Sequence, residues 1–193
     1  EVIETPDKEN AVYLAAGVMP VSDAAEDYPA LVIGNFVLGG GTLSSRLGDR
    51  VRQKEGLSYG VGSFLRASSV DERTSFYLYA ITNPANMSKV EAAISDEISK
   101  MLNNGFESGE IESAKTGYLE QQKVEWNTDE VLASRLAELL YADRDMNYYS
   151  KQIASIQALT HEQVGAVMKK RINPKTISLV VSGDFAKGAK AAG

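Results

Sequence analysis

The sequence predicts an α+β domain of two layers, in which helices pack on one face of a mostly antiparallel or mixed sheet. Three observations predict it. Apolar or alternating segments typical of strands stand near both chain ends and after residue 57, and helical periodicity fills the stretch from 86 to 171. No internal repeat or low-complexity linker divides the 193 residues. We therefore predict one domain, 1–193, excised from a longer protein, with residues 185–193 as a loose tail.

The first elements are a strand and a helix. Residues 11–19 are an apolar run that ends before Pro20, as a strand should. Residues 23–38 have apolar residues on a broad face, which predicts a helix, and three glycines at Gly39, Gly40 and Gly41 end it.

A second, shorter helix is expected between Thr42, as its N-cap, and Gly56, as the left-handed residue that ends it. Apolar residues recur every four positions on this helix, at Leu43, Leu47 and Val51. At about 100° per residue, Arg52 lies away from that stripe and is free to project elsewhere.

An antiparallel hairpin follows, with strands at 57–67 and 74–82 and a turn at Asp71 and Glu72. Its first strand alternates with period two. This places Leu57, Tyr59, Val61 and Leu65 on one face.

The rest of the chain is predicted to be helical up to a last strand at 176–182. Helices are expected at 86–103, from Ser108, after the cap Thr128, at 148–157, and after a capping box of Thr160 and Gln163. The expected buried stripe of the helix at 86–103 is Val90, Ile94, Ile98, Met101 and Leu102. That of the helix after Thr128 is Leu132, Leu136, Leu139 and Leu140.

Composition excludes several classes of function. A net charge of −6 without a basic cluster is unlike a nucleic-acid surface. The longest apolar runs are a few residues, short of the ~20 that a membrane span needs. The absence of cysteine removes disulfides, thiolate nucleophiles and cysteine-ligated zinc.

The chain has one histidine, His161, so we predict no metal site in it. A helical zinc site would need a second histidine one turn on, and that position is Gly165. A single histidine also leaves no Ser-His-Asp or Cys-His arrangement within the chain. We expect His161 to lie on the surface at the start of its helix.

The glycines at 39–41 precede a predicted helix start and could hold an anion through backbone N–H groups. A phosphate loop would also need a lysine, which is absent at the required place. The alternatives are a turn that needs positive φ, or a loop lying against an extended peptide.

Arg52 and Tyr59 flank the reversal at Gly56 and each has two interpretations. Arg52 could be a cation that stabilises the end of its helix through the dipole. Tyr59 could be a core aromatic that alternates in step with Leu57 and Val61. Composition and spacing leave these structural interpretations open beside a functional one.

The segment SSRLGDRVRQKEGLSYGVGS, residues 44–63, resembles the signature of a known half-domain: the C-terminal, non-zinc half of the insulinase/pitrilysin family of zinc metallopeptidases, which includes mitochondrial processing peptidase. The preceding glycines, the predicted helix at 86–103 and the ending LTHEQVGAVMKKRINPKTISLVVSGD agree, so the resemblance covers about residues 10–184. Its most specific element is the Arg-x6-Tyr spacing of Arg52 and Tyr59.

The resemblance implies a processing-peptidase-like fold and a partner. In this family two homologous halves close around a chamber, zinc is bound by the other half, and this half contributes an Arg and a Tyr to the peptide substrate. We therefore assign Tyr59 to stabilising the oxyanion and Arg52 to holding the substrate backbone. Gly39, Gly40 and Gly41 are assigned to lining the substrate path.

Two other functions stay open. Relatives in the same family serve as structural scaffold subunits without proteolysis, although a scaffold has no need of the Arg52 and Tyr59 pair. A nucleotide-binding domain that uses the glycine cluster is the third reading.

Overall fold

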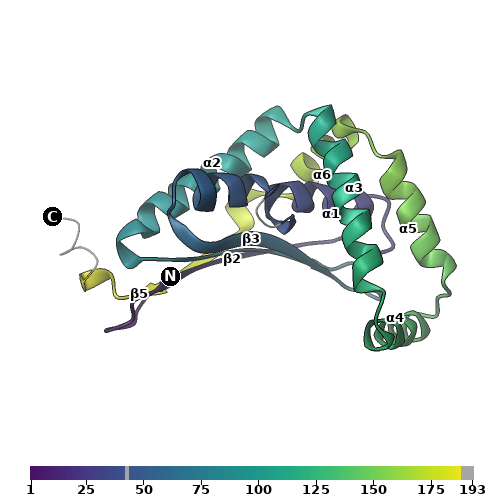
Figure 1. Ribbon diagram of the computed structural model, residues 1–193, viewed down its shortest axis with the longest axis horizontal. Coiled ribbons are helices and arrows are strands. Elements are labelled where there is room, and N and C mark those ends of the chain that lie inside the picture. The colour runs from purple at the N-terminus through teal and green to yellow at the C-terminus, as the bar shows by residue number, and fades with distance from the viewer. Residues whose placement is uncertain (42–43, 188–193) are drawn as a thin grey trace.

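The computed structural model describes residues 1–41 and 44–187 (Figure 1). The strands are β1 (Val2–Glu4), β2 (Ala11–Met19), β3 (Ser58–Ala67), β4 (Thr74–Thr82) and β5 (Ser178–Gly183). The α-helices are α1 (Tyr28–Asn35), α2 (Met87–Asn104), α3 (Ser108–Glu125), α4 (Asp129–Tyr141), α5 (Asn147–Ala158) and α6 (His161–Arg171).

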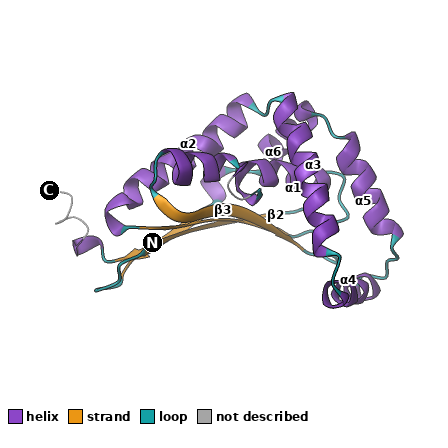
Figure 2. Ribbon diagram, in the orientation of Figure 1, coloured by secondary structure: helices purple, strands orange, loops and turns teal. Residues whose placement is uncertain are grey.

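The strands form one mixed sheet in the order β1-β5-β2-β4-β3. β1 runs parallel to β5, and the other neighbours are antiparallel. Figure 2 shows the helices on one side of the sheet, with α4 beyond its end. The two-layer α+β prediction is therefore confirmed.

The core lies between the inner sheet face and the helices. Phe76 and Leu78 of β4 are buried from the sheet side, and Leu31 of α1 and Ile94 of α2 are buried from the helix side. The predicted buried face of α2 is confirmed for its central residues, because Val90, Ile94, Ile98 and Met101 are all at most 6% exposed. Burial of one apolar stripe per helix holds the layers together.

Local capping signals in the helical half are also confirmed. The Thr128 side chain accepts a hydrogen bond from the Val131 N–H at 3.3 Å, at the start of α4. Thr160 and Gln163 form a reciprocal capping box at the start of α6. These caps satisfy backbone donors that helix starts leave unpaired.

One prediction about the N-terminal part was wrong, and one strand there was missed. The predicted helix at 23–38 begins only at Tyr28, with Pro29 in its first turn, where the fixed φ of proline suits a helix start. Its end continues as a π-helical turn over Phe36–Gly40. Strand β1 was not predicted, since three exposed residues carry no periodicity and are held by pairing with β5.

The leucine stripe predicted to be buried on α4 is mostly exposed, which corrects the sequence prediction. Leu139 is 4% exposed, whereas Leu132, Leu136 and Leu140 are 39%, 43% and 80% exposed. The helical period was right. What it could not show is that α4 lies beyond the end of the sheet, where the described chain offers little to cover it (Figure 1).

Thr42 and Leu43, predicted as N-cap and first stripe residue of the second helix, lie outside the described residues. Residues 185–187, assigned to a loose tail, begin a helical turn in which the Phe185 N–H donates to the Glu4 carboxylate at 3.2 Å. Across the described ranges, none of the helices combines the length and apolar character that a membrane crossing requires.

Candidate functional site

The glycines at 39–41 allow a close approach of two backbones. A Cβ on Gly39 would lie 2.4 Å from the Ser63 backbone nitrogen, and one on Gly62 would lie 2.9 Å from the Gly39 carbonyl oxygen. Real Cβ contacts are not this short, so the π-helical turn can press against β3 only with glycine at both places. Gly41 has φ −80°, and Gly39 and Gly40 are not among the glycines with positive φ. The turn with positive φ, which was one alternative for this cluster, is therefore not observed.

A short helix follows, residues 46–54, here called the arginine helix, whose Gly48–Lys54 part is π-helical. It ends on Gly56 with φ +61°, which confirms the predicted left-handed residue. π-helical turns are uncommon and are frequent at functional sites.

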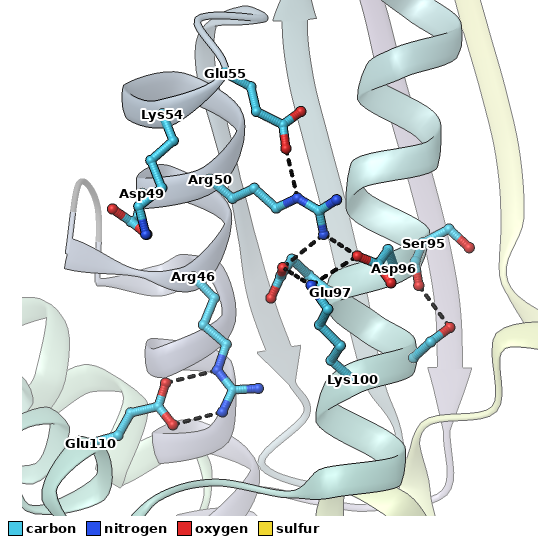
Figure 3. Close-up of polar contacts among 11 residues, drawn as sticks. Arg46, Asp49, Arg50, Lys54, Glu55, Ser95, Asp96, Glu97, Lys100 and Glu110 are labelled. Atoms are coloured by element: carbon cyan, nitrogen blue, oxygen red, sulfur yellow. Dashed lines mark hydrogen bonds and ion pairs between the residues drawn. The ribbon is translucent and has the colours of Figure 1, made fainter.

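Two arginines of this helix are held by carboxylates (Figure 3). Arg46 Nε and Nη2 each donate to the Glu110 carboxylate at 2.7 Å, and Nη2 also donates to the Gly105 carbonyl at 3.0 Å. The Arg46 guanidinium lies 4.9 Å from the centre of the Phe106 ring. This side chain therefore fastens the arginine helix to the start of α3.

Arg50 fastens the same helix to α2. Its Nε donates to Glu55 at 2.8 Å, and its Nη1 donates to Glu97 at 2.8 Å and to Asp96. Lys100 adds a second cation, 2.9 Å from Asp96. The hydrogen bonds to Glu55, Asp96 and Glu97 raise the pKa of Arg50, so its charge is permanent.

Arg52 is not held in this way. Its side chain is exposed, and none of the residues at 1–41 and 44–187 forms a hydrogen bond or ion pair with it. Arg46 and Arg50 are four positions apart and both face neighbouring elements, whereas Arg52 is two positions on, about half a turn further round the π-helical part. The helix thus holds two arginines inward and leaves a third available.

Tyr59 is exposed, contrary to the expected alternation. Ser58 pairs with Thr82 and Gly60 pairs with Ile81, so a β-bulge at Tyr59 shifts the register. As a result Ser58 is 9% exposed and Tyr59 is 66% exposed, while Val61 returns to the core at 7%. Bulges re-aim a side chain beside a site, and here the bulge excludes the core-aromatic interpretation of Tyr59.

A pocket of about 320 Å³ joins several of these elements. Among its lining residues are Gly39, Gly40 and Arg52, which the sequence assigned to one site, together with Gly60. Gly41 and Tyr59 do not line it, although Tyr59 directly precedes Gly60. The structure therefore groups Arg52 with two of the three glycines and leaves Tyr59 on the neighbouring surface.

Sequence analysis missed two aromatic residues of this pocket, Phe64 and Tyr79. The Phe64 ring stacks on Tyr77 at 4.7 Å and lies 6.4 Å from the Tyr79 ring. Their meeting depends on the β3–β4 register, which pairs Phe64 with Tyr77 and Gly62 with Tyr79. The alternation of the hairpin residues could have placed Phe64, Tyr77 and Tyr79 together on the outer face of the sheet.

The described residues do not fit a zinc site. Within the ranges that the structure describes, histidines, cysteines and acids nowhere gather in a group of three or more that could hold a metal ion. His161 lies 3.2 Å from the Glu162 carboxylate at the start of α6, on a different element from Arg52 and Tyr59.

Comparison with known proteins identifies the family. The family model described as "Peptidase M16 inactive domain" matches residues 1–118. The chain belongs to the peptidase M16 inactive domain family. The resemblance to the non-zinc half of the insulinase-type peptidases is thereby confirmed.

Solved structures agree. A peptidase M16 inactive domain from Pseudomonas fluorescens is 26% identical, with a TM-score of 0.83, over 94% of this chain and 42% of that one. The inactive peptidase domain of a protein from Bordetella parapertussis has the same fold, with 17% identity and a TM-score of 0.72 over 89% of this chain and 91% of that one.

A curated relative, the "Non-peptidase homolog YmxG" of Helicobacter pylori, is 26% identical over 179 residues. The match includes 90% of this chain and 40% of the relative. The chain therefore spans about two fifths of the length of that relative.

Proposed function

We propose that this chain is the non-catalytic, substrate-binding half of a zinc metallopeptidase, and that it completes the active site of a zinc-bearing, homologous partner half for peptide hydrolysis. Family membership supports the inactive role. The observation that carries the proposal is the free Arg52 beside two arginines that are fully engaged.

The side chain of Arg52 is suited to binding a peptide substrate. Its guanidinium presents fixed N–H donors that match carbonyl oxygens or a carboxylate, and its charge cannot be lost near neutral pH. The adjoining pocket is lined by Gly39 and Gly40, where the lack of side chains leaves room for an extended backbone. We assign Arg52 to binding the substrate backbone and the glycines to the substrate path.

The hydroxyl of Tyr59 is suited to stabilising the transition state of peptide hydrolysis. Peptide hydrolysis develops negative charge on the scissile carbonyl oxygen, and an oriented phenol O–H can stabilise that charge by a few kcal/mol. The bulge at Ser58 and Gly60 turns Tyr59 out of the core, where it can reach a substrate held between two halves.

A protein partner is supported by apolar side chains that the chain leaves exposed. The outer sheet face carries Val12, Leu14, Phe64, Tyr79 and Ile81, each 37–44% exposed. α4 adds its three exposed leucines. Exposed apolar surface of this kind is typical of protein interfaces.

The experiment combines the purified chain with the zinc-bearing half encoded in the same genome and measures cleavage of a fluorogenic peptide. Arg52→Ala should raise KM and lower kcat/KM about 10- to 100-fold, because one charged hydrogen-bond donor to the substrate is lost. Arg73→Ala, an exposed arginine in the β3–β4 turn, is the matched control and should change neither constant. Unchanged kinetics for Arg52→Ala, in a folded and assembled pair, would refute the assignment.

A scaffold role is the second candidate, and the name of the relative YmxG, a non-peptidase homologue, is the observation that favours it. The same reconstitution separates the two. A stable complex that cleaves no peptide of a diverse library would favour the scaffold, whereas cleavage that depends on Arg52 and Tyr59 would favour the peptidase half.

A further inference from the structure

A second and larger cavity, about 1170 Å³, lies among α3, α4, α5, the start of α1 and the end of β3. It shares no lining residue with the pocket beside Arg52. Figure 1 shows α3, α4 and α5 together at one end of the molecule, away from the N-terminus. The volume is sufficient for a drug-sized molecule or a few residues of peptide.

Much of the wall is apolar or aromatic. Trp126 meets Tyr149 edge to face at 4.8 Å, and Tyr149 meets Tyr148 in the same way at 5.2 Å. The aliphatic part of the lining is Val32, Leu65, Leu119, Leu139, Ile153 and Ile156. A ligand of this cavity therefore needs an apolar body.

Several of the aromatic side chains also carry hydrogen-bond donors. Trp126 Nε1 is buried and has no hydrogen-bond partner among the described residues. The phenols of Tyr28 and Tyr118 can donate, because tyrosine is protonated at neutral pH and burial raises the pKa of both further. Arg135 adds a guanidinium 5.8 Å from the centre of the Tyr149 ring.

The charges of the lining also favour an anion. Four cations line the cavity, at Arg66, Lys123, Arg135 and Arg144, against three acids, at Asp23, Glu120 and Glu138. The lining is thus positive by one charge (four minus three) within a chain of net charge −6. Arg144 is held by Asp23 at 2.9 Å, whereas Arg135 reaches Glu138, whose side chain is 60% exposed, only at 3.5 Å. Arg135 also forms a side-chain hydrogen bond with Tyr149, and Arg66 is exposed without a hydrogen bond or ion pair among the described residues. Arg135, beside the aromatic wall, and Arg66 are therefore the two cations most available to a ligand.

We propose that this cavity binds an apolar carboxylate, with the hydrocarbon or aromatic body against the wall and the carboxylate near Arg135. The free carboxyl terminus of a short apolar peptide and a small hydrophobic acid share this chemistry. Arg135 supplies the charge, and the Trp126 N–H and the tyrosine hydroxyls supply further donors. The site shares no lining residue with the pocket beside Arg52 and does not include Tyr59.

The chain carries its own reporter, because Trp126 is the only tryptophan and lines the cavity. Fluorescence of the purified chain is titrated with N-acetyl-leucyl-leucine, with its C-terminal amide, and with 4-phenylbutyrate. The acids should give a saturable change in Trp126 emission below about 1 mM, and the amide should bind at least about tenfold more weakly. Tighter binding of the peptide acid than of phenylbutyrate points to a peptide terminus as the source, and the reverse order to a small acid.

Arg135→Gln should weaken binding of the acids about tenfold and leave the amide unchanged. Arg73→Gln, in the β3–β4 turn outside the cavity, is the matched control. Since Arg135→Gln could disturb α4, Tyr118→Phe, which keeps the ring, serves as a second variant, with circular dichroism of each. Equal binding of acid and amide, no saturable change with any probe, or full acid affinity in both folded variants would overturn the proposal.

Discussion

The inner and outer sides of the stretch from Gly39 to Gly62 are built differently. On the inner side, Gly39 lies against the β3 backbone, and Arg46 and Arg50 are engaged by carboxylates of neighbouring elements. On the outer side, Arg52 and Tyr59 are exposed. Arginines of one helix thus have two different roles. Arg46 and Arg50 fix the backbone through inward contacts, whereas Arg52 has no partner in the described chain and is available to another molecule.

The largest effect on stability should come from the closest inward contact. Gly39→Ala places a Cβ where the Ser63 nitrogen stands, so the turn must move away from β3, and we expect a loss of about 1–3 kcal/mol in the free energy of unfolding. Gly60→Ala is the matched control, since a Cβ there meets nothing within 4 Å. Urea denaturation measures both. Equal stability of the two variants would show that the backbone contact is not tight.

Arg46→Ala should follow, with a loss of about 1–2 kcal/mol, because it removes a paired carboxylate contact, a carbonyl contact and a ring contact together. Glu110→Gln, which keeps the shape and removes the charge, should cost less. If Arg46→Ala unfolds at the wild-type urea concentration, Arg46 does not anchor the arginine helix.

The Arg50 cluster predicts a dependence on pH. Hydrogen bonds from Lys100 and Arg50 lower the pKa of the Asp96 carboxyl below its ordinary 3.8. The folded state therefore binds that proton less readily than the unfolded state, so the stabilisation is complete above pH 3.8 and is lost as pH falls through the lowered value. The stability difference between wild type and Asp96→Asn should shrink from about pH 6 to about pH 3. A difference that stays constant over this range would exclude the linkage.

The smallest effect is expected for the exposed pair on the same helix. Lys54 lies 2.6 Å from Asp49, but the two side chains are 70% and 45% exposed. Asp49→Asn should change stability by less than about 0.5 kcal/mol, because solvent screens such pairs. If Asp49→Asn lowers stability as much as Arg46→Ala does, exposed ion pairs on this helix stabilise the fold as much as inward-facing ones, and the proposed contrast is wrong.

Local signals made much of the fold predictable. Helical period gave the buried face of α2, and short-range hydrogen bonding gave the caps at Thr128 and Thr160. The angle between Arg52 and the stripe through Leu47 and Val51 was likewise readable from sequence. Each of these depends on residues a few positions apart.

Features set by distant neighbours were not predictable. The bulge at Tyr59 depends on the register with β4, and the close approach of Gly39 depends on β3 lying beside it. Exposure of Leu136 and Leu140 depends on what stands opposite α4. Period alone therefore allowed a core position for Tyr59 and predicted a buried leucine stripe on α4. Tertiary placement exposes Tyr59 and leaves only Leu139 of that stripe buried.

The most direct measurement of the proposed division between anchoring and presented residues is made on Tyr59→Phe in the reconstituted pair. Removal of the hydroxyl of Tyr59, a residue that is 66% exposed, should leave the melting temperature unchanged and lower kcat about 10- to 1000-fold with little change in KM. Tyr141→Phe, at 74% exposure on α4, is the control and should alter neither. Wild-type kcat for Tyr59→Phe, or a fall in its melting temperature that accounts for the lost activity, would contradict the presentation of Tyr59 to a substrate.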